Sequence, residues 1–149
     1  MRNRVVSLLA ALALAGCAKT PPEKAPAEQA KAQRSIEDRD WELVSLGTLD
    51  HPLGAGGKPA TLRFDAAARR AGGNAGCNRY SAAYVLAGDS LRFEAAMSTR
   101  MACTEGMELE SAWLGAMSHV ATWSATDSTL MLAGPEGPLA RFAERRAPG

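Results

Sequence analysis

The chain has 149 residues, of which 46% are hydrophobic and 22% are charged, with 17 Lys and Arg against 16 Asp and Glu. A protein that binds nucleic acid through its phosphates needs a basic face, so this balance, in a chain that carries the export signal described below, argues against nucleic acid as a partner. The part with the composition of a folded protein, about residues 40–143, has the length of one small domain and should form one core.

The N-terminus has the organisation of a secretory signal peptide. Arg2 and Arg4 form a charged start, residues 5–13 form an apolar run, and the small residues of Leu-Ala-Gly at 14–16 precede Cys17. The apolar run is about half as long as a helix that spans a bilayer, so we expect this segment to direct export and then to be removed. The Leu-Ala-Gly-Cys sequence resembles the lipobox of bacterial lipoproteins.

The lipobox resemblance implies cleavage after Gly16 and lipidation of Cys17, with acylation of the new amino terminus. Each buried methylene contributes about 0.8 kcal/mol, so several acyl chains on one residue make a lasting membrane anchor. Because Ala18 and not an acidic residue follows Cys17, the resemblance favours the outer membrane, with the domain in the periplasm. The alternative is an ordinary signal peptide that happens to precede a cysteine.

Residues 17–39 have the composition of a flexible tether. They are rich in Pro, Ala, Lys, Glu, Gln and Arg, and Ile36 is the only large aliphatic residue among them. This is too little apolar surface to offset the entropy of ordering the chain. Roughly twenty such residues have an r.m.s. reach of about 25 Å. We therefore expect a lipidated tether over 17–39, a domain over 40–144 and a short tail over 145–149.

The apolar pattern of the domain is mostly that of β-strands. Two apolar residues separated by one position recur and place two side chains on one face of a strand. These pairs are Trp41 with Leu43, Leu62 with Phe64, Leu91 with Phe93, Leu130 with Leu132, and Ala140 with Phe142. Residues 82–86 read as one further strand, which the Gly88-Asp89 turn closes.

One segment has the period of a helix. After Thr104, which we predict as the N-cap, apolar residues recur at three- and four-residue spacing up to a helix end near His119. These residues are Leu109, Trp113, Ala116 or Met117, and Val120. Glu105, Glu108 and Glu110 lie in the first turns and read as a solvated face. The predicted fold class is α+β and β-dominated: a curled antiparallel sheet or partly open barrel with one helix packed across it.

Two motifs, GCNRY at 76–80 and STRMAC at 98–103, give the domain a family resemblance. The accompanying positions are Trp41, Leu43, Leu62, Phe64, Gly73, Glu110, Leu130 and Leu132. Together they resemble a META domain of the HslJ type, although Ala82 stands where that family commonly has Gly. The resemblance implies an envelope protein linked to heat shock, in a family that includes lipoproteins, and it brings no catalytic residues.

Cys77 and Cys103 are the two cysteines that remain once Cys17 is lipidated. In an oxidising compartment we expect them to form a disulfide bond, which would contribute about 3.5 kcal/mol by closing its loop. The alternative is a soft-metal site for Cu(I), because three methionines lie near Cys103 in the sequence. They are Met97, Met101 and Met107.

The residues beside these cysteines form a candidate binding patch made of Asn78, Arg79, Tyr80 and Arg100. A disulfide would bring the two arginines into one neighbourhood, where they could receive a carboxylate or phosphate ligand. The alternative is that they pair with acidic residues or loop carbonyls. Asn78 could equally satisfy backbone groups of the loop. Tyr80 and Tyr84 are expected on one strand face, with their hydroxyl groups in water.

Catalysis has little support in this sequence. His51 lies in a Gly-rich loop and His119 at a helix end, and neither accompanies a nucleophile and an orienting acid. We therefore expect no enzyme, no cofactor and no resident metal. The favoured function is a binding or structural module of the cell envelope with an unknown envelope protein as partner. The alternatives are a carrier of a lipid or small hydrophobic ligand, and a soft-metal-binding lipoprotein.

Overall fold

The structure is a computed structural model, and it describes residues 35–146. The predicted signal peptide, Cys17 and most of the predicted tether lie outside the described residues. The strands are β1 Asp40–Leu46, β2 Leu49–Asp50, β3 Thr61–Asp65, β4 Arg70–Asn74, β5 Arg79–Ala87, β6 Ser90–Phe93, β7 Met97–Ser98, β8 Thr122–Ala125, β9 Thr129–Gly134 and β10 Gly137–Glu144. A 3-10 turn, η1, spans Ala55–Gly57, and the helix α2 spans Met107–Met117.

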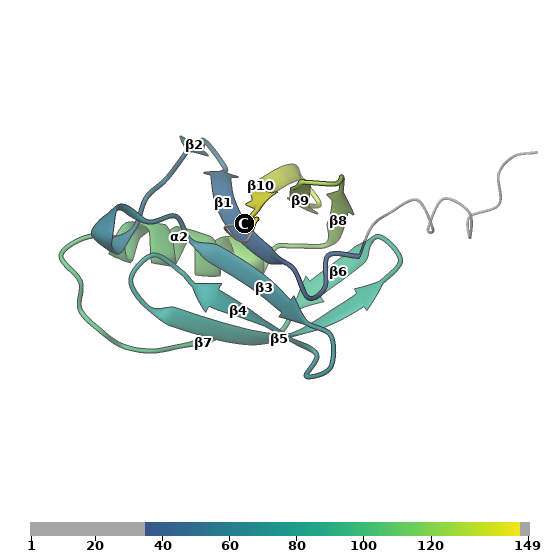
Figure 1. Cartoon of the computed structure of the whole chain (residues 1–149), viewed down its shortest axis with the longest axis horizontal. Helices are drawn as coiled ribbons and strands as arrows, with labels where there is room; N and C mark the ends of the chain where they lie inside the picture. The colour runs from purple at the N-terminus through teal and green to yellow at the C-terminus, as the bar shows by residue number, and fades with distance from the viewer. Residues whose placement is uncertain (1–34, 147–149) are drawn as a thin grey trace, which may run out of the picture.

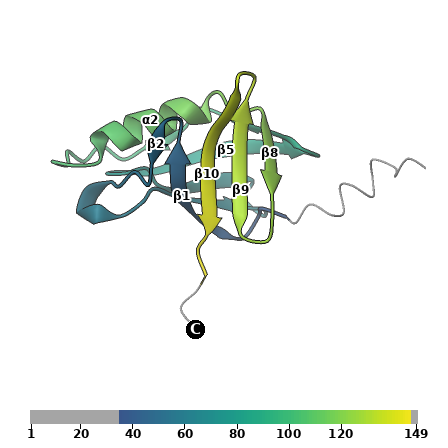
Figure 2. The ribbon, with the colours of Figure 1, turned by 90° about the horizontal axis from the view of Figure 1, so that it is seen from above.

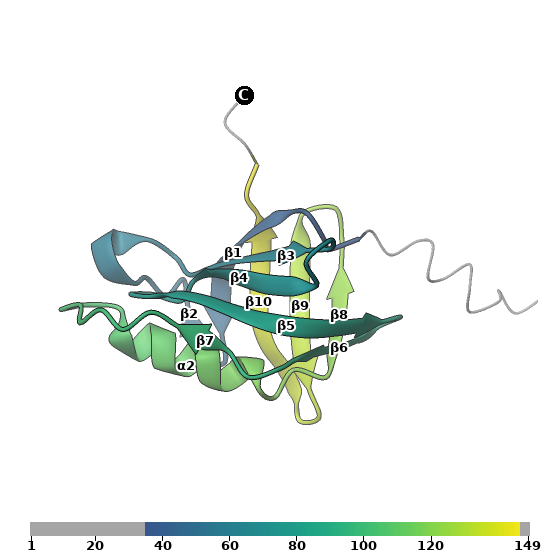
Figure 3. The same ribbon diagram turned by 90° about the horizontal axis from the view of Figure 1, so that it is seen from below.

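Eight of the strands form a closed antiparallel barrel (Figure 1). The order around the barrel is β10, β9, β8, β6, β5, β4, β3 and β1, and β1 pairs again with β10. Figure 3 shows β3, β4 and β5 on one wall with β8, β9 and β10 behind them. This arrangement confirms the predicted β-dominated fold. The barrel is closed, whereas the sequence predicted a curled sheet or a partly open barrel. The short strands β2 and β7 pair with β1 and β5 outside this circle.

The predicted pairs of apolar residues face the barrel interior, as strand periodicity requires. Trp41, Phe64, Leu91, Leu130 and Phe142 are each fully buried. An eight-stranded barrel is just wide enough for side chains to fill its interior. The core of this barrel is therefore the protein's own side chains, and the interior gives no support to a carrier of hydrophobic ligands.

The helix α2 lies across one end of the barrel (Figure 2). Leu109, Trp113 and Met117 recur at helical spacing and are buried, and the Trp113 ring meets Phe142 edge to face at 5.1 Å between ring centroids. This packing confirms the apolar face that the sequence predicts. No helix within residues 35–146 has the length and apolar character needed to cross a membrane.

The segment before β1 closes the other end of the barrel. Ile36, which the sequence analysis assigned to the tether, is fully buried, and its carbonyl accepts a hydrogen bond from Trp41 Nε1 at 3.1 Å. Arg39 Nε donates to Glu144 Oε1 at 2.7 Å and its guanidinium lies 4.4 Å from the centre of the Trp41 ring. The folded part therefore includes Ile36 and not only the residues from 40 onward. A lone aliphatic residue in a polar segment carries no periodicity that could reveal this.

Candidate functional site

The carboxylate of Glu110 in α2 holds the loop that follows β4. Glu110 Oε2 accepts hydrogen bonds from the backbone N–H groups of Asn78 at 2.6 Å and Cys77 at 3.3 Å. Its other oxygen, Oε1, accepts from Asn78 Nδ2 at 3.0 Å. Only 7% of Glu110 is exposed. The helix is thereby attached to this loop by charge-assisted hydrogen bonds, which are stronger than neutral ones.

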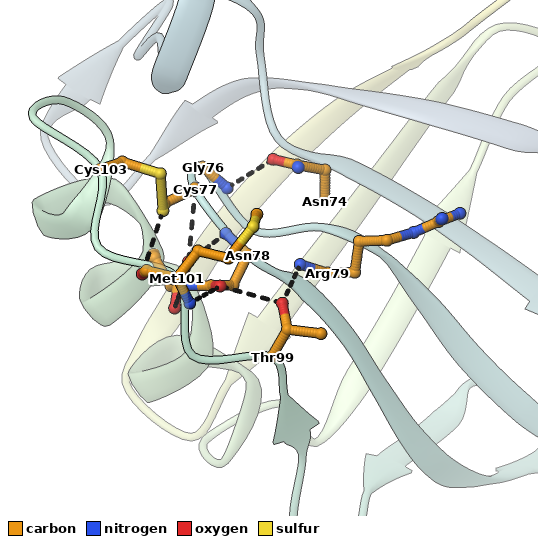
Figure 4. The surroundings of a disulfide bond; sticks show 9 residues. Asn74, Gly76, Cys77, Asn78, Arg79, Thr99, Met101 and Cys103 are labelled. Carbon is orange, nitrogen blue, oxygen red and sulfur yellow. Dashed lines mark hydrogen bonds between the residues drawn. A yellow bond between two sulfur atoms is a disulfide. The ribbon is translucent and has the colours of Figure 1, made fainter.

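The side-chain amide of Asn78 joins the same loop to the segment before Cys103 (Figure 4). Its Oδ1 accepts from Thr99 Oγ1 at 2.9 Å and from the backbone N–H of Met101 at 2.7 Å. Its Nδ2 donates to the carbonyl of Met101 at 3.1 Å and to Glu110. An amide has two donor hydrogens and two acceptor lone pairs, and here each has a partner. Asn78 is 1% exposed, so it satisfies backbone groups inside the protein and cannot contact a partner.

A disulfide bond between Cys77 and Cys103 crosses the same region (Figure 4). It joins residues 26 apart in sequence, with 5.9 Å between their Cα atoms. Disulfide sulfurs are not the thiolate ligands that a soft-metal site needs. Met101 and Met107 are exposed by 58% and 42%, and residues 35–146 hold no group of three or more His, Cys, Asp and Glu residues arranged so that it could hold a metal ion.

The start of α2 is set by a close approach of backbones and not by a side-chain cap. The prediction of Thr104 as the N-cap is wrong: Gly106 occupies that position with φ 87° and without a capping side chain. A Cβ on Gly106 would lie 2.6 Å from the carbonyl oxygen of Gly76. The same carbonyl accepts a hydrogen bond from Ala55 N at 2.7 Å. Only glycine fits here, because its backbone reaches positive φ and lacks a Cβ.

The predicted binding patch is wrong for two of its four residues. Asn78 and Tyr80 are buried, whereas Arg79 and Arg100 are exposed. The alternation of β5 turns Tyr80 inward, where its hydroxyl donates to the carbonyl of Thr61 at 2.9 Å. Burial raises the pKa of Tyr80. The sequence motif at 76–80 is therefore mainly an interior motif.

Tyr84 lies on the same inner face as Tyr80, as predicted, but its hydroxyl donates to Glu37 Oε1 and so is not free in water. Burial, and next the hydrogen bond to Glu37, raise the pKa of Tyr84. Glu37 belongs to the segment that closes the barrel. Both hydroxyl groups thus bond to protein atoms, which corrects the expectation of hydrated tyrosines.

Glu110 is the site residue whose role was not predicted from the sequence. It was assigned to a solvated face with Glu105 and Glu108, and the structure leaves only those two exposed. The available signal was helical spacing, because Glu110 lies three residues before Trp113 and seven before Met117, on the buried side of α2. A glutamate at such a position needs buried donors, and the loop at 77–78 supplies them.

The other candidate groups lie at the surface. His51 follows β2, with a side chain 73% exposed and 3.8 Å from Asp50, and His119 follows α2. Arg79 lines a shallow pocket of about 300 Å³ on the outer wall of the barrel, and Arg100 does not line it. A second pocket of about 550 Å³ lies between the β2 loop and the start of α2.

Comparison with known proteins agrees with this fold. The META domain model matches residues 34–147. An NMR structure of a protein from Burkholderia xenovorans is similar with a TM-score of 0.65 and 26% identity, covering 96% of this chain and all of that one. A second NMR structure has a TM-score of 0.57 at 19% identity and covers 81% of this chain and 95% of that one.

A crystal structure of a DUF4847 family protein from Bacteroides vulgatus is similar with a TM-score of 0.53 at 11% identity, and covers 76% of this chain and 96% of that one. At this identity the likeness is one of fold alone, as it is for the second NMR structure. No match is found among curated proteins.

Proposed function

The chain belongs to the META domain family, and we propose that it is a lipid-anchored protein of the cell envelope whose domain acts by binding, without catalysis. The proposal places Cys17 in the outer membrane and the domain in the periplasm. It assigns the protein to envelope integrity or the response to envelope stress.

The observation that carries the non-catalytic role is the use of the polar motif residues inside the protein. A catalytic acid or base must reach the proton it transfers. Asn78 and Glu110 are buried, and the hydrogen bonds of the Asn78 amide all go to protein atoms. Together with the disulfide they hold three chain segments in one arrangement. A surface on such a rigid support loses little entropy on binding, which favours recognition as the role of the domain.

The anchored arrangement is supported by the lipobox-like sequence that ends at Cys17 and by the position of the segment before β1. The segment before β1 lies at the side of the barrel away from α2 (Figure 2). A tether attached at that end leaves α2 and the cross-linked loop on the side away from the attachment point. The 17 residues between Cys17 and Ser35 have the composition that predicts a tether, and a tether of this length would have an r.m.s. reach of about 20–25 Å.

The test is complementation in a deletion strain of the source bacterium under envelope stress. We expect the wild-type chain to restore growth and Cys17→Ser, although folded, to restore it poorly. His51→Ala and His119→Ala should restore growth fully, because neither histidine has a chemical role in this account. A folded histidine variant that fails would contradict the non-catalytic claim. Full growth with a released Cys17→Ser protein would contradict the need for an anchor.

A further inference from the structure

The outer wall of the barrel over β1, β3, β4 and β5 carries a groove made of two adjoining pockets. One has a volume of about 300 Å³ and the other about 400 Å³, and Thr61 and Arg145 line both. We call this surface the arginine groove. Its charged residues are Asp40, Glu42, Lys58, Arg63, Arg79 and Arg145.

Strand register explains why these side chains share one surface. Arg63 in β3 lies opposite Gly72 in β4, and Gly72 lies opposite Ser81 in β5. Arg79 lies opposite Asn74 in the neighbouring row. Because Gly72 has no side chain, the surface between Arg63 and Arg79 is open there. A Cβ at this position would lie 2.6 Å from the Tyr80 carbonyl oxygen. The close approach of the Tyr80 carbonyl therefore requires glycine at position 72, and the missing side chain leaves space for the pocket.

The charges in the groove do not cancel. Arg63 pairs with Asp40 and Arg145 pairs with Glu42, each at 3.3 Å. The guanidinium of Arg79 has no ion pair or side-chain hydrogen bond within residues 35–146, and it points away from the disulfide in Figure 4. Lys58, in the second pocket, has no acidic partner in the same described range either. Four cations against two carboxylates leave two cations unpaired, one in each pocket.

We propose that the arginine groove binds an oxyanion, a phosphate or carboxylate group of an envelope molecule, with Arg79 as its main contact. This inference rests on the proposed binding function and names the chemistry of the ligand. A guanidinium can hold two oxygens of one phosphate or carboxylate in parallel hydrogen bonds. Exposed ion pairs contribute only about 0–1 kcal/mol, so Arg63 and Arg145 can exchange Asp40 and Glu42 for a ligand at little cost. Two unpaired cations favour a ligand with two anionic groups.

The test uses the mature chain with Cys17→Ser, labelled for NMR and titrated with sodium pyrophosphate at low ionic strength. We expect saturable shifts at Gly72, Gly73 and Arg79. We also expect pyrophosphate and citrate to bind more tightly than phosphate and acetate, because they carry more than one anionic group. Arg79→Ala, with an unchanged melting temperature, should weaken pyrophosphate binding at least about tenfold, since it removes a charge-assisted bidentate contact. The affinity of Arg79→Lys for pyrophosphate should lie between those of the wild type and Arg79→Ala.

Arg92→Ala is the matched control, because Arg92 is exposed on β6 and lies outside the groove. Equal weakening by Arg79→Ala and Arg92→Ala, or shifts without saturation, would overturn the proposal. Sedimentation with phosphatidylglycerol vesicles, lost in Arg79→Ala, would identify a lipid headgroup as the source of the oxyanion. Groove binding without sedimentation would identify a soluble source.

Complementation separates this inference from the proposed function. An Arg79→Ala protein that loses pyrophosphate binding and also fails to restore growth supports the groove as the working site. An Arg79→Ala protein that loses pyrophosphate binding but restores growth fully would show that the groove is not the working site. The proposed function, an anchored domain that acts by binding, would then still stand.

Discussion

Replacement of Glu110 by alanine should be among the most destabilising single changes in α2. It removes the acceptor for the backbone N–H groups of Cys77 and Asn78, and for the amide of Asn78. A buried donor left without an acceptor costs about 1–3 kcal/mol, and here two backbone donors and one side-chain donor lose theirs. Because bonds in one network are not additive, we expect a loss of about 3–4 kcal/mol in the free energy of unfolding.

Such a loss would be a large share of the stability of a small domain, which is about 5–15 kcal/mol. It corresponds to a melting temperature lower by about 12–20 °C, taking about 4–5 °C per kcal/mol for a domain of this size. Urea unfolding of the oxidised protein, followed by tryptophan fluorescence, measures the change. Glu108→Ala is the matched control, because Glu108 is exposed in the first turn of α2, and it should change stability by less than about 0.5 kcal/mol.

Glu110→Gln makes the test sharper. Its single carbonyl oxygen can accept from the Cys77 and Asn78 N–H groups, but its amide nitrogen then faces the donor Asn78 Nδ2. We expect its loss to lie between those of Glu108→Ala and Glu110→Ala. If Glu110→Ala unfolds at the same urea concentration as Glu108→Ala, the carboxylate does not hold the loop and the reasoning is refuted.

Three further outcomes are expected. Cys17→Ser should move the protein from the membrane fraction to the soluble periplasmic fraction and abolish palmitate labelling; unchanged labelling would contradict the anchor. Non-reduced peptide mapping should find Cys77 linked to Cys103, and Cys77→Ala should lower stability by about 2–5 kcal/mol; free thiols in envelope-isolated protein would count against this. Because burial raises the pKa of Tyr80 and Tyr84 above their ordinary value of about 10, the unfolded chain loses these protons first. The free energy of unfolding should therefore fall as pH rises above about 10, and less steeply in Tyr80→Phe; equal slopes would contradict the burial of this hydroxyl.

Periodicity was sufficient to predict the elements that face the core. Trp41, Phe64 and Phe142 lie where alternation places them, and Trp113 lies on the helix face that the spacing predicts. Such residues reveal themselves because burial repeats every second or every third to fourth position. No periodic pattern in the sequence indicated that the barrel would close. It depends on β6 meeting β8, where Ser90 faces Thr122 in one register pair between segments far apart in sequence.

The site was harder to predict because its residues act through contacts across the sequence. Motif position placed Asn78 and Tyr80 beside Arg79 in a candidate patch, but strand alternation and the turn of the loop direct the first two inward. Glu110 was assigned to water from its helix position, although its partners lie over thirty residues earlier. Residues that are neighbours in the sequence lie close together in space, but the tertiary fold determines which of them are buried and which are exposed.

The central claim is that the motif residues form a rigid, internally bonded end of the barrel and not a reactive or mobile surface. Native-state hydrogen exchange at the amides of Cys77, Asn78 and Met101 tests it most directly, since these N–H groups bond to Glu110 and to the Asn78 amide. We predict that all three exchange as slowly as the amides of the core strands, through global unfolding alone. Exchange at these amides through local opening, many times faster than in the core strands, would contradict the account.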